Sequence, residues 1–498
     1  MDSSQKDQSA HQSGETAGLE ENQTRDGHVR EIAKLQAELK QAESTVAALT
    51  AELTARDVRV NAILGSRAWR YANRISRLKS LLWSPITDRL NALRGGQSNH
   101  PRSGGAKISL NDANSEAMPA APRASAADDV ICLSLVDWDS GVQRPQQIMS
   151  QFARNGHRVF CVRLDRVLRG DSAPRFLISK LQENVYDVVV AAIRPVRLNQ
   201  EVVSGPNGEA ITKSLADLRR AYEIDNAVAY VASPAWTDVA KQLKKSGVKI
   251  IYDCVDEWDG FPGFSNAISA AERRLAAECD LLIVSGERLH DKWRSLNCQP
   301  LLARNAVDPD FFRALHTPSN LLPRLAHPIV GYLGVLASWF DVDLMMELAQ
   351  KRPGYQFVLV GSALDIDLRE LRQLENVHVL GHQPYATMPQ FLYHFDVCLI
   401  PFRLNKTTAA VDPIKVYEYL SCGKPVVSVA LPELQPLKDL VYIATSAERF
   451  LEHLDIAIAE KDEKLVERRR AFAQQNTWSH RYETIMNGFR QTSPAPLD

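Results

Sequence analysis

From residue 128 onward, short apolar runs alternate with longer segments in which apolar residues recur every three or four positions. Short apolar runs predict buried strands, and the three-to-four spacing predicts amphipathic helices that pack against them. Strands that alternate with helices form parallel sheets, so the pattern predicts an α/β fold. The candidate strands are Val130–Val136, Arg158–Arg163, Val185–Ile193, Ala227–Val231, Lys249–Cys254, Asp280–Val284, Pro328–Leu333, Gln356–Val360, Val377–Leu380, Val397–Ile400 and Pro425–Val429.

These strands fall into two groups, separated near Leu301–Pro328. Each group has the length of an ordinary domain. We therefore expect an N-terminal Rossmann-like domain over residues 128–310 and a C-terminal Rossmann-like domain over residues 325–475. In such doubly wound sheets, ligands bind in the crevice beyond the carboxyl ends of the strands.

A different pattern occupies residues 28–64. Apolar residues there alternate three and four positions apart, which is the a/d seam of a coiled coil and predicts oligomerisation. The alternative is a single amphipathic helix that packs on the globular part. The residues of the seam are Ile32, Leu35, Leu39, Ala42, Val46, Leu49 and Leu53. Residues 1–27 are polar, and we expect them to be disordered.

Residues 65–94 predict a basic amphipathic helix. Trp69 and Trp83 accompany its basic residues, and Asp88 is its one acid. Such a segment suits an anionic membrane surface, whereas the alternative is a helix docked on protein with its arginines in solvent. The basic residues are Arg67, Arg70, Arg74, Arg77, Lys79, Arg89 and Arg94. Residues 95–127 are rich in Gly, Ser, Asn, Ala and Pro, which predicts a flexible linker.

Composition narrows the class of protein. The 59 Lys and Arg residues against 60 Asp and Glu residues give a net charge of −1, which argues against nucleic acid as a partner. The seven cysteines form no C-x-x-C pair, so we expect them to be reduced, without disulfides or a zinc site. The polar N-terminus lacks a signal-peptide core, and no run of about 18 apolar residues could span a membrane. We expect a cytoplasmic protein, peripheral at the inner face of the plasma membrane.

The most informative stretch is DPIKVYEYLSCGKPVV, residues 412–427. It predicts a short helix with Asp412 as N-cap, Pro413 at the first helical position and Gly423 at the C-terminal cap, followed by a buried strand. Lys415 and Glu418 share one face near the helix N-terminus. A helix N-terminus with a lysine favours a diphosphate, and a carboxylate can accept two ribose hydroxyls. The alternative is an ordinary surface helix with an i,i+3 ion pair.

This stretch resembles the nucleotide-sugar-binding motif of GT-B glycosyltransferases, especially the large retaining family (family 4-like) with sucrose synthase and many bacterial polysaccharide transferases. The resemblance implies that Glu418 holds the donor ribose. That family usually carries a second glutamate eight positions earlier, where this chain has Ala410. It also usually has an Arg and a Lys after the first strand of the second domain, and residues 331–344 contain neither. The lysine three residues before Glu418 is similar to that of the xanthan glucuronosyltransferase group, which implies that Lys415 contacts the diphosphate.

The resemblance covers about residues 128–490 and implies further features. The fold would be GT-B, with two doubly wound Rossmann-like domains that face each other across a cleft. Asn305-Ala306-Val307-Asp308 resembles the Asn-Gly-Val-Asp that closes the first domain of these enzymes. A helix over residues 476–490, beginning near Trp478, would return to the first domain. The activity would be transfer of a sugar from a nucleoside diphosphate, with UDP expected, to a glycan or polyprenyl-linked glycan, without a metal cofactor.

Loops at strand ends supply candidates for the acceptor side. Arg144 follows the first strand and opens a helix, where its charge opposes the helix dipole, so we expect another reason for it, such as an acceptor phosphate beside Gly141. After Lys249–Cys254, four carboxylates crowd residues 253–259. Crowded like charges raise a carboxyl pKa toward neutrality, which makes Asp253 and Asp256 the candidate general bases. A solvated acidic loop is the alternative.

Loops of the second domain supply candidates for the donor side. Gly331 and Gly334 flank the end of its first strand, where glycine would let the backbone approach a phosphate. Gly381 and Tyr385 leave another strand end, a loop that meets the nucleotide base in similar enzymes. The two Asp-x-Asp sequences, which begin at Asp341 and Asp365, lie where aspartates cap helices, so we expect no metal there.

Two other functions fit the same residues. One is a GT-B nucleotide-sugar epimerase, which would turn over free nucleotide-sugar without an acceptor. The other is a non-catalytic coiled-coil scaffold that keeps the fold and donor binding but has lost the chemistry.

Overall fold

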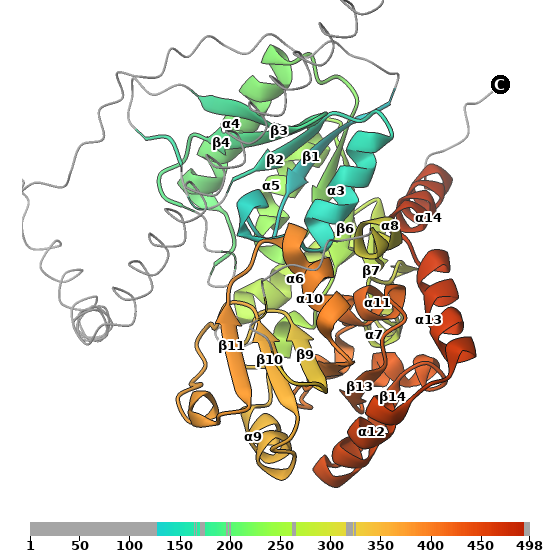
Figure 1. Cartoon of the computed structure of the whole chain (residues 1–498). Helices are drawn as coiled ribbons and strands as arrows, with labels where there is room; N and C mark the ends of the chain where they lie inside the picture. Colours follow the sequence, from blue (N-terminus) through green and yellow to red (C-terminus); the bar gives the residue numbers. More distant parts are fainter. Residues whose placement is uncertain are drawn as a thin grey trace, which may run out of the picture. The chain divides into compact units, whose positions relative to one another are not determined.

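The computed structural model describes residues 127–492, except residues 164, 166, 170–174, 196–197, 199–200, 261–264, 315–321 and 323–324. All of these residues belong to one compact unit, Ala113–Asp498. They form two domains, each built on a largely parallel sheet covered by helices (Figure 1). The segments expected to be disordered, coiled-coil and basic-helical, and all of the linker except residue 127, lie outside the described residues.

The N-terminal domain has an eight-stranded sheet in the order β3-β4-β2-β1-β5-β6-β7-β8. Strand β3 runs antiparallel to β4, and the other neighbours are parallel. The order reverses at β1, so the carboxyl ends of β1 and β5 flank the point where such sheets bind ligands. The strands are β1 (Asp129–Leu133), β2 (Val159–Val162), β3 (Phe176–Gln182), β4 (Val185–Val190), β5 (Ala227–Val231), β6 (Lys249–Cys254), β7 (Leu281–Val284) and β8 (Leu301–Leu302).

Helices cover both faces of this sheet because successive side chains of a buried strand point to opposite faces. Val130 and Cys132 of β1 pack with α3 and α14 in one apolar cluster. Ile131 and Leu133 pack with α4, α5 and α6 in another. The helices of this domain are α3 (Arg144–Arg154), α4 (Gly205–Ala221), α5 (Thr237–Lys245), α6 (Asn266–Glu278) and α7 (Glu287–Ser295), together with the returning α14 (Trp478–Gln491).

The C-terminal domain has a six-stranded, fully parallel sheet in the order β11-β10-β9-β12-β13-β14. Numbered within the domain, this is the order 3-2-1-4-5-6 of dinucleotide-binding sheets, with its reversal between β9 and β12. The elements are α8 (Pro309–Arg313), β9 (Ile329–Leu333), α9 (Val342–Lys351), β10 (Gln356–Val360), β11 (Val377–Gly381), α10 (Met388–His394), β12 (Val397–Ile400), α11 (Ile414–Ser421), β13 (Val426–Val429), β14 (Tyr442–Ala444), α12 (Ala447–Ala459) and α13 (Glu463–Gln475).

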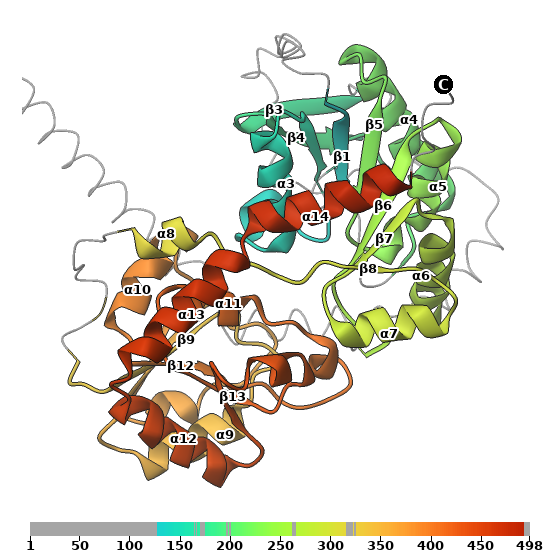
Figure 2. The same ribbon diagram turned by 90° about the vertical axis from the view of Figure 1, so that its right-hand side faces the viewer.

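The chain passes between the two domains twice, and the two passages lie side by side. Val307 and Thr477 form a parallel bridge. The Val307 N–H donates to the carbonyl of Asn476 at 3.1 Å, and the Trp478 N–H donates to the carbonyl of Val307 at 3.3 Å. Beyond this double hinge, α14 lies against the N-terminal domain, while α13 lies on the C-terminal domain (Figure 2). Trp478 and Tyr482 of α14 are buried there beside Phe152 of α3.

Every strand predicted from the sequence is present, and each observed end lies within three residues of the predicted one. The predicted α/β class is confirmed. The prediction missed β3, β8 and β14. Strand β3 is an edge strand with mostly partly exposed and exposed residues, and β8 and β14 are two and three residues long, so none gives a buried apolar run.

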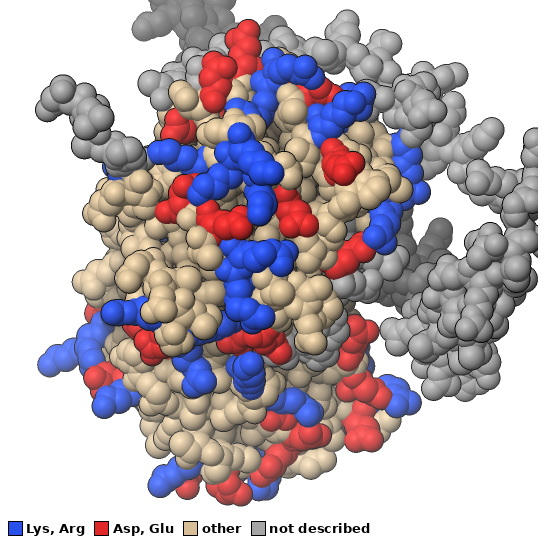
Figure 3. Space-filling view, turned by 180° about the vertical axis from the view of Figure 1, so that it is seen from behind, with Lys and Arg blue, Asp and Glu red and all other residues tan. Residues whose placement is uncertain are grey.

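Basic and acidic side chains are interspersed over the face shown in Figure 3. This distribution agrees with the near-zero net charge of the chain. Within the described residues, no helix is both long enough and apolar enough to cross a membrane.

Candidate functional site

Helix α11 lies in the stretch that the sequence singled out. It begins at Ile414, one residue later than predicted, with Pro413 as its N-cap. Its C-terminal end is as predicted: Gly423 has a φ of +74°, the Gly423 N–H donates to Leu420 at 2.9 Å, and the Lys424 N–H donates to Tyr419 at 3.2 Å. These two bonds close a Schellman motif. The helix therefore ends where the glycine dictates.

The prediction that Asp412 caps this helix is wrong. Its carboxylate accepts the backbone N–H of Asn305 at 2.7 Å and the hydroxyl of Tyr417 at 3.0 and 3.1 Å. Only 3% of Asp412 is exposed. Burial raises the pKa of its carboxyl to about 6, although the nearby Arg304 guanidinium and the Asn305 N–H lower it in part. Asp412 thus ties the start of the motif to the segment that connects the two domains.

Helix α11 is held beside the reversal point of the C-terminal sheet. The hydroxyl of Tyr419 accepts the backbone N–H of Leu333, the last residue of β9, at 2.9 Å. Val416 and Leu420 are fully buried in the core of the domain. The apolar face of the helix is therefore fixed against the sheet, and its remaining face carries the candidate donor residues.

Lys415 and Glu418 form the predicted pair on that remaining face. The Lys415 ammonium lies 2.9 Å from Oε2 of Glu418, and the side chains are 20% and 3% exposed. The Tyr385 hydroxyl donates to Oε1 of Glu418 at 3.4 Å, and Gln147 of α3 donates to the Tyr385 hydroxyl at 3.2 Å. Two candidate donor residues, Tyr385 and Glu418, are thus in contact, and a residue of the N-terminal domain joins them.

The glycines predicted to approach a phosphate differ in what they do. Gly331 lies inside β9, and a Cβ there would lie 2.0 Å from the ring of Phe395. Core packing therefore requires glycine at position 331, and the prediction that Gly331 faces a phosphate is wrong. Gly334 lies beyond the strand end with a φ of +153°, and a Cβ on Gly361 would lie 1.8 Å from its carbonyl oxygen. Gly381 ends β11 with a φ of +73° and open space around it.

Arg144 opens α3, as predicted, and the structure gives the reason for an arginine there. Its guanidinium makes a bidentate ion pair with Asp253, with Nε and Nη2 at 2.8 and 2.9 Å from the two carboxylate oxygens. It also donates to the carbonyl of Arg304 and the side chain of Asn305, both at 3.2 Å. Arg144 is 5% exposed and Asp253 is fully buried. The partner of Arg144 is therefore Asp253 rather than an acceptor phosphate.

The Arg144–Asp253 ion pair also distinguishes the two aspartates that were candidates for the general base. Both oxygens of Asp253 are held by Arg144, and the Tyr230 hydroxyl donates to one of them. Both oxygens of this fully buried carboxylate are therefore engaged by protein groups rather than presented to an acceptor. Burial lowers the pKa of Arg144, but the charge and the hydrogen bonds of Asp253, together with Tyr230 and Asp412, raise that pKa overall. Asp253 therefore fits an internal ion pair, and the candidate base is Asp256.

Asp256 is half-buried in the loop after β6. Burial, and then the negative charge of Asp253, raises the pKa of its carboxyl to about 6, while the Arg144 charge lowers it. The direction agrees with the prediction from crowded carboxylates, but burial is the larger cause. Within the described part of the chain, its carboxylate has no recorded hydrogen bond or ion pair. A partly accessible carboxyl with a pKa near neutrality can accept a proton from an alcohol in a transition state.

The residues around Asp256 are held on both sides. Lys292 of α7 pairs with Glu257 at 2.8 Å and with the buried Glu272 at 3.3 Å. The Ser285 hydroxyl donates to the carbonyl of Val255 at 2.9 Å, and the Trp258 indole donates to the hydroxyl of Tyr252 at 3.2 Å. The loop thus presents Asp256 from a rigid frame, although no pattern in the sequence indicated these long-range supports.

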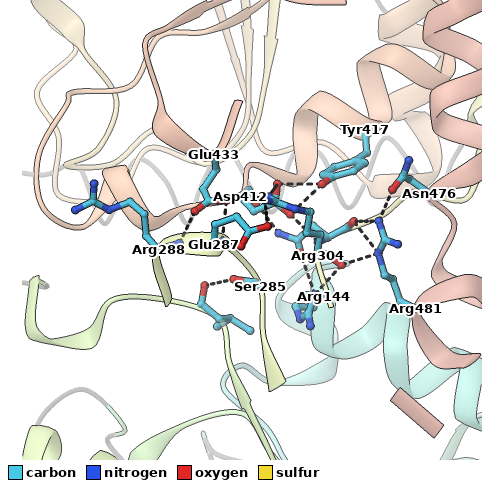
Figure 4. Close-up of polar contacts among 12 residues, drawn as sticks. Arg144, Ser285, Glu287, Arg288, Arg304, Asp412, Tyr417, Glu433, Asn476 and Arg481 are labelled. Carbon is cyan, nitrogen blue, oxygen red and sulfur yellow. Dashed lines mark hydrogen bonds and ion pairs between the residues drawn. The ribbon is translucent and has the colours of Figure 1, made fainter. Parts of the chain in front are cut away.

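A cluster of charged residues, drawn in Figure 4, joins the two domains. Glu433, in the 3₁₀ helix Pro432–Leu437, accepts the backbone N–H groups of Glu287 and Arg288 at 3.0 and 2.9 Å. Those groups form the N-terminus of α7, where a carboxylate is favoured by the helix dipole. Arg304 also contacts Glu433, at 2.8 Å, and lies 3.9 Å from Asp412.

Further contacts stabilise this interdomain cluster. Arg481 of α14 donates to the carbonyls of Arg304 and Asn305. A Cβ on Gly286 would lie 2.8 Å from the Glu433 carboxyl, so the glycine leaves room for that side chain. Glu433 is 3% exposed. No local pattern in the sequence indicates Glu433, which follows a proline in a short 3₁₀ helix.

The loops with other candidate residues lie as follows. Gly141 follows the 3₁₀ helix Trp138–Ser140 with a φ of +125°, a conformation that favours glycine. Asp341 is the N-cap of α9 and accepts the Leu344 N–H at 3.1 Å, so its predicted capping role is confirmed. Asp367 is bound by the side chain and backbone of Arg369.

A protein family matches most of the C-terminal domain, and one sequence relative covers about half of the chain. The protein family described as "Glycosyl transferase-like" matches residues 342–487, which include α11. The "Putative teichuronic acid biosynthesis glycosyltransferase TuaH" of Bacillus subtilis (strain 168) is 28% identical over 263 residues. That alignment covers 48% of this chain and 66% of the relative, which is slightly less than two thirds of its length.

Solved structures share the architecture of the described domains. Sucrose-phosphate synthase from Thermosynechococcus elongatus superimposes with a TM-score of 0.56 at 14% identity, over 73% of this chain and 99% of that one. HepE of Anabaena, in complex with UDP and glucose, gives a TM-score of 0.53 at 15% identity, over 73% and 100%. An Escherichia coli protein titled "Trehalose-6-phosphate", bound with UDP-2-fluoro glucose, gives a TM-score of 0.56 at 13% identity, over 74% and 100%.

At such low identity the structural matches show the fold alone, and that fold is the expected GT-B arrangement of two Rossmann-like domains. The family match and the sequence relative both carry a glycosyltransferase description, which the fold alone does not supply. The fold is therefore that of GT-B glycosyltransferases, and the Lys415–Glu418 helix lies within the region that the glycosyltransferase family description matches.

Proposed function

We propose that this protein transfers a sugar from a nucleoside diphosphate sugar, with UDP as the nucleotide, to a glycan or lipid-linked glycan. The observation that carries the proposal is the Lys415–Glu418 pair on the first turns of α11, fixed through Tyr419 at the end of β9. This is the reversal point of a sheet with the order of dinucleotide-binding proteins. A cation, a helix N-terminus and a carboxylate therefore occupy the edge where the nucleotide of such a domain binds.

Each part of the donor has a candidate partner. The N-terminus of α11, Lys415 and the loop at Gly334 would bind the diphosphate. Glu418 would accept the ribose hydroxyls, since an ionised carboxylate is a pure acceptor with two oxygens. The loop from Gly381 to Tyr385 would contact the base.

On the acceptor side, Asp256 would take the proton from the attacking hydroxyl. Its raised pKa, its rigid loop and its lack of a recorded partner support that role. Asp253 and Arg144 would set the charge beside it without contacting the acceptor, and Gly141 would shape the acceptor loop. A base of this kind belongs to an inverting reaction, so the stereochemistry of the product is part of the proposal.

The relatives support the choice of substrates. HepE is described in complex with UDP and glucose, and the Escherichia coli structure is bound with UDP-2-fluoro glucose. The name of the Bacillus subtilis relative puts that protein in teichuronic acid biosynthesis, which supports a cell-envelope polysaccharide as acceptor.

The test is calorimetry of the full chain against UDP, GDP and ADP. We expect selective binding of UDP, weakened by about 1.5–3 kcal/mol in Glu418→Ala, the size of hydrogen bonds to a charged group, and weakened also in Lys415→Ala. Lys351→Ala and Glu347→Ala are matched controls, because they break an exposed Lys–Glu pair on α9 of the same domain. Unchanged affinity in Glu418→Ala would refute the ribose assignment.

Turnover assays separate the two other functions. An epimerase would convert free nucleotide-sugar without an acceptor, and a scaffold would bind UDP without transferring sugar to any acceptor. Neither is favoured by the family match and the sequence relative, which carry the glycosyltransferase description.

We also propose that the segments outside the described residues place the protein at its acceptor. The heptads of residues 28–64 would form a homo-oligomer, and the basic residues of 65–94 would bind the anionic inner face of the plasma membrane. A polyprenyl-linked acceptor would lie in that membrane, which is why the two proposals support each other.

A further inference from the structure

The carboxylate proposed to bind the donor ribose is covered in this structure. Glu418 is 2% exposed, although its role requires a ligand to reach it. Its two oxygens face Lys415 at 2.9 Å and the Tyr385 hydroxyl at 3.4 Å. Because Glu418 lies on a helix packed into the core, the side chains that cover it must move to admit a ribose.

The cover is built from short elements. Tyr385 begins a three-residue 3₁₀ helix, Tyr385–Thr387, after β11. Its ring stacks on Phe311 of the five-residue helix α8, with ring centroids 5.0 Å apart and an interplanar angle of 1°. Phe312 of the same helix meets the Tyr385 ring edge-on at 5.9 Å. Two short elements next to the interdomain connection move more readily than a sheet or a long helix.

The other domain holds this cover in place. Gln147 lies on the first turn of α3, three residues after Arg144, whose ion pair with Asp253 anchors that turn. Its amide nitrogen donates to the Tyr385 hydroxyl at 3.2 Å, while that hydroxyl donates to Glu418. The hydroxyl is thus used in both senses, as acceptor from one domain and donor to the other.

We propose that Tyr385 is a gate over the donor site and that Gln147 holds this gate shut from the N-terminal domain. The tyrosine hydroxyl occupies on Glu418 the place of a ribose hydroxyl, which offers the same donor. A donor exchanges one hydroxyl for another once the N-terminal domain withdraws Gln147. The inference rests on the proposed function, and it couples entry of the donor to separation of the two domains at the cleft.

The gate has a measurable consequence for affinity. A ligand that binds only the open form has an apparent Kd equal to its intrinsic Kd divided by the open fraction. Breaking the hydrogen bond that favours the closed form lowers the free energy of opening by at most the free energy of that bond, and the open fraction rises accordingly. For one hydrogen bond, this corresponds to about a two- to ten-fold decrease in the Kd for UDP.

The experiment measures UDP binding to the full chain by calorimetry in Gln147→Leu and Tyr385→Phe. Leucine keeps the bulk of glutamine, and phenylalanine keeps the stack on Phe311 while removing the hydroxyl. We expect UDP to bind both variants about two- to ten-fold more tightly than wild type. Tyr393→Phe is the matched control, because Tyr393 is 62% exposed on the neighbouring helix α10, and its affinity should not change.

The outcomes separate the gate from the function on which it rests. Unchanged or weaker UDP binding in Gln147→Leu and Tyr385→Phe, with binding still weakened in Glu418→Ala as predicted above, would overturn the gate and leave the donor site intact. Weaker binding in Tyr385→Phe alone would make its hydroxyl a direct donor contact, which also overturns the gate. No UDP binding by wild type, Tyr385→Phe and Gln147→Leu together would overturn the proposed function and the gate with it.

Discussion

Asp256 and Asp253 are three residues apart, yet neutralising them should change the stability of the fold in opposite directions. The carboxyl of Asp256 has a pKa of about 6 in the folded protein, against about 4 in an unfolded chain. A raised carboxyl pKa means that the folded state favours the protonated form. Ionisation of Asp256 therefore opposes folding, and Asp256→Asn should remove that opposition while abolishing transfer.

The magnitude follows from the shift. One pKa unit corresponds to about 1.4 kcal/mol, so a shift of about two units corresponds to roughly 3 kcal/mol where Asp256 is ionised in both states. Because the side chain is only half-buried, solvent screening reduces the expected gain to about 1–3 kcal/mol at pH 8. The gain should be about half as large at pH 5, where the folded state is mostly protonated, and should vanish below about pH 4.

Asp253→Asn provides the contrast. It would leave the buried guanidinium of Arg144 without its bidentate partner. Breaking a buried ion pair from one side destabilises by about 3–5 kcal/mol. Urea unfolding of wild type and both variants at pH 5, 6.5 and 8 measures these differences. A destabilised Asp256→Asn variant, or a gain that does not grow with pH, would refute the description of Asp256 as an unpaired carboxylate raised by burial.

Three further results are expected. The pH profile of kcat/KM should rise to a plateau above about pH 6 as Asp256 loses its proton, and a profile that is flat down to pH 5 would remove it as the base. Glu433→Gln should lower the free energy of unfolding by about 2–4 kcal/mol, because an amide N–H₂ would face a helix N–H or Arg304. The control Glu287→Gln, at a side chain that is 55% exposed, should change the free energy of unfolding by less than about 0.5 kcal/mol. Equal effects of the two substitutions would contradict the role of Glu433 in joining the domains. Deleting residues 65–94 should release the protein from phosphatidylserine liposomes, and retained binding would exclude the membrane role.

The sequence predicted local features well, and α11 shows why. Its C-terminal end is encoded by Gly423, whose left-handed conformation and two backbone bonds involve only neighbouring residues. Its N-terminal end is not, because Asp412 bonds to Asn305, which lies 107 residues away. A capping rule sees only the adjacent helix, and tertiary contacts decided the role of this aspartate.

The same distinction separates the candidate site residues. The crowded carboxylates indicated a raised pKa near Asp256, but Asp253 is paired with Arg144, which lies 109 residues away, so the local pattern could not tell the two aspartates apart. Gly334 has a φ of +153°, which favours glycine, whereas Gly331 is a glycine because the ring of Phe395 lies against it, a contact that only the structure shows. Glu433 gave no signal, since its partners on α7 lie about 146 residues earlier.

The double hinge at Val307 and Thr477 limits how the two domains can move. A single connecting strand would let one domain twist and swing in any direction about the other. Two connecting segments that are hydrogen-bonded side by side act as a hinge with a defined axis, so the accessible motion is close to one rotation. Each opening of the cleft then returns the domains along the same path. The proposed alignment of Asp256 with the donor would thereby be restored after every cycle by the backbone itself.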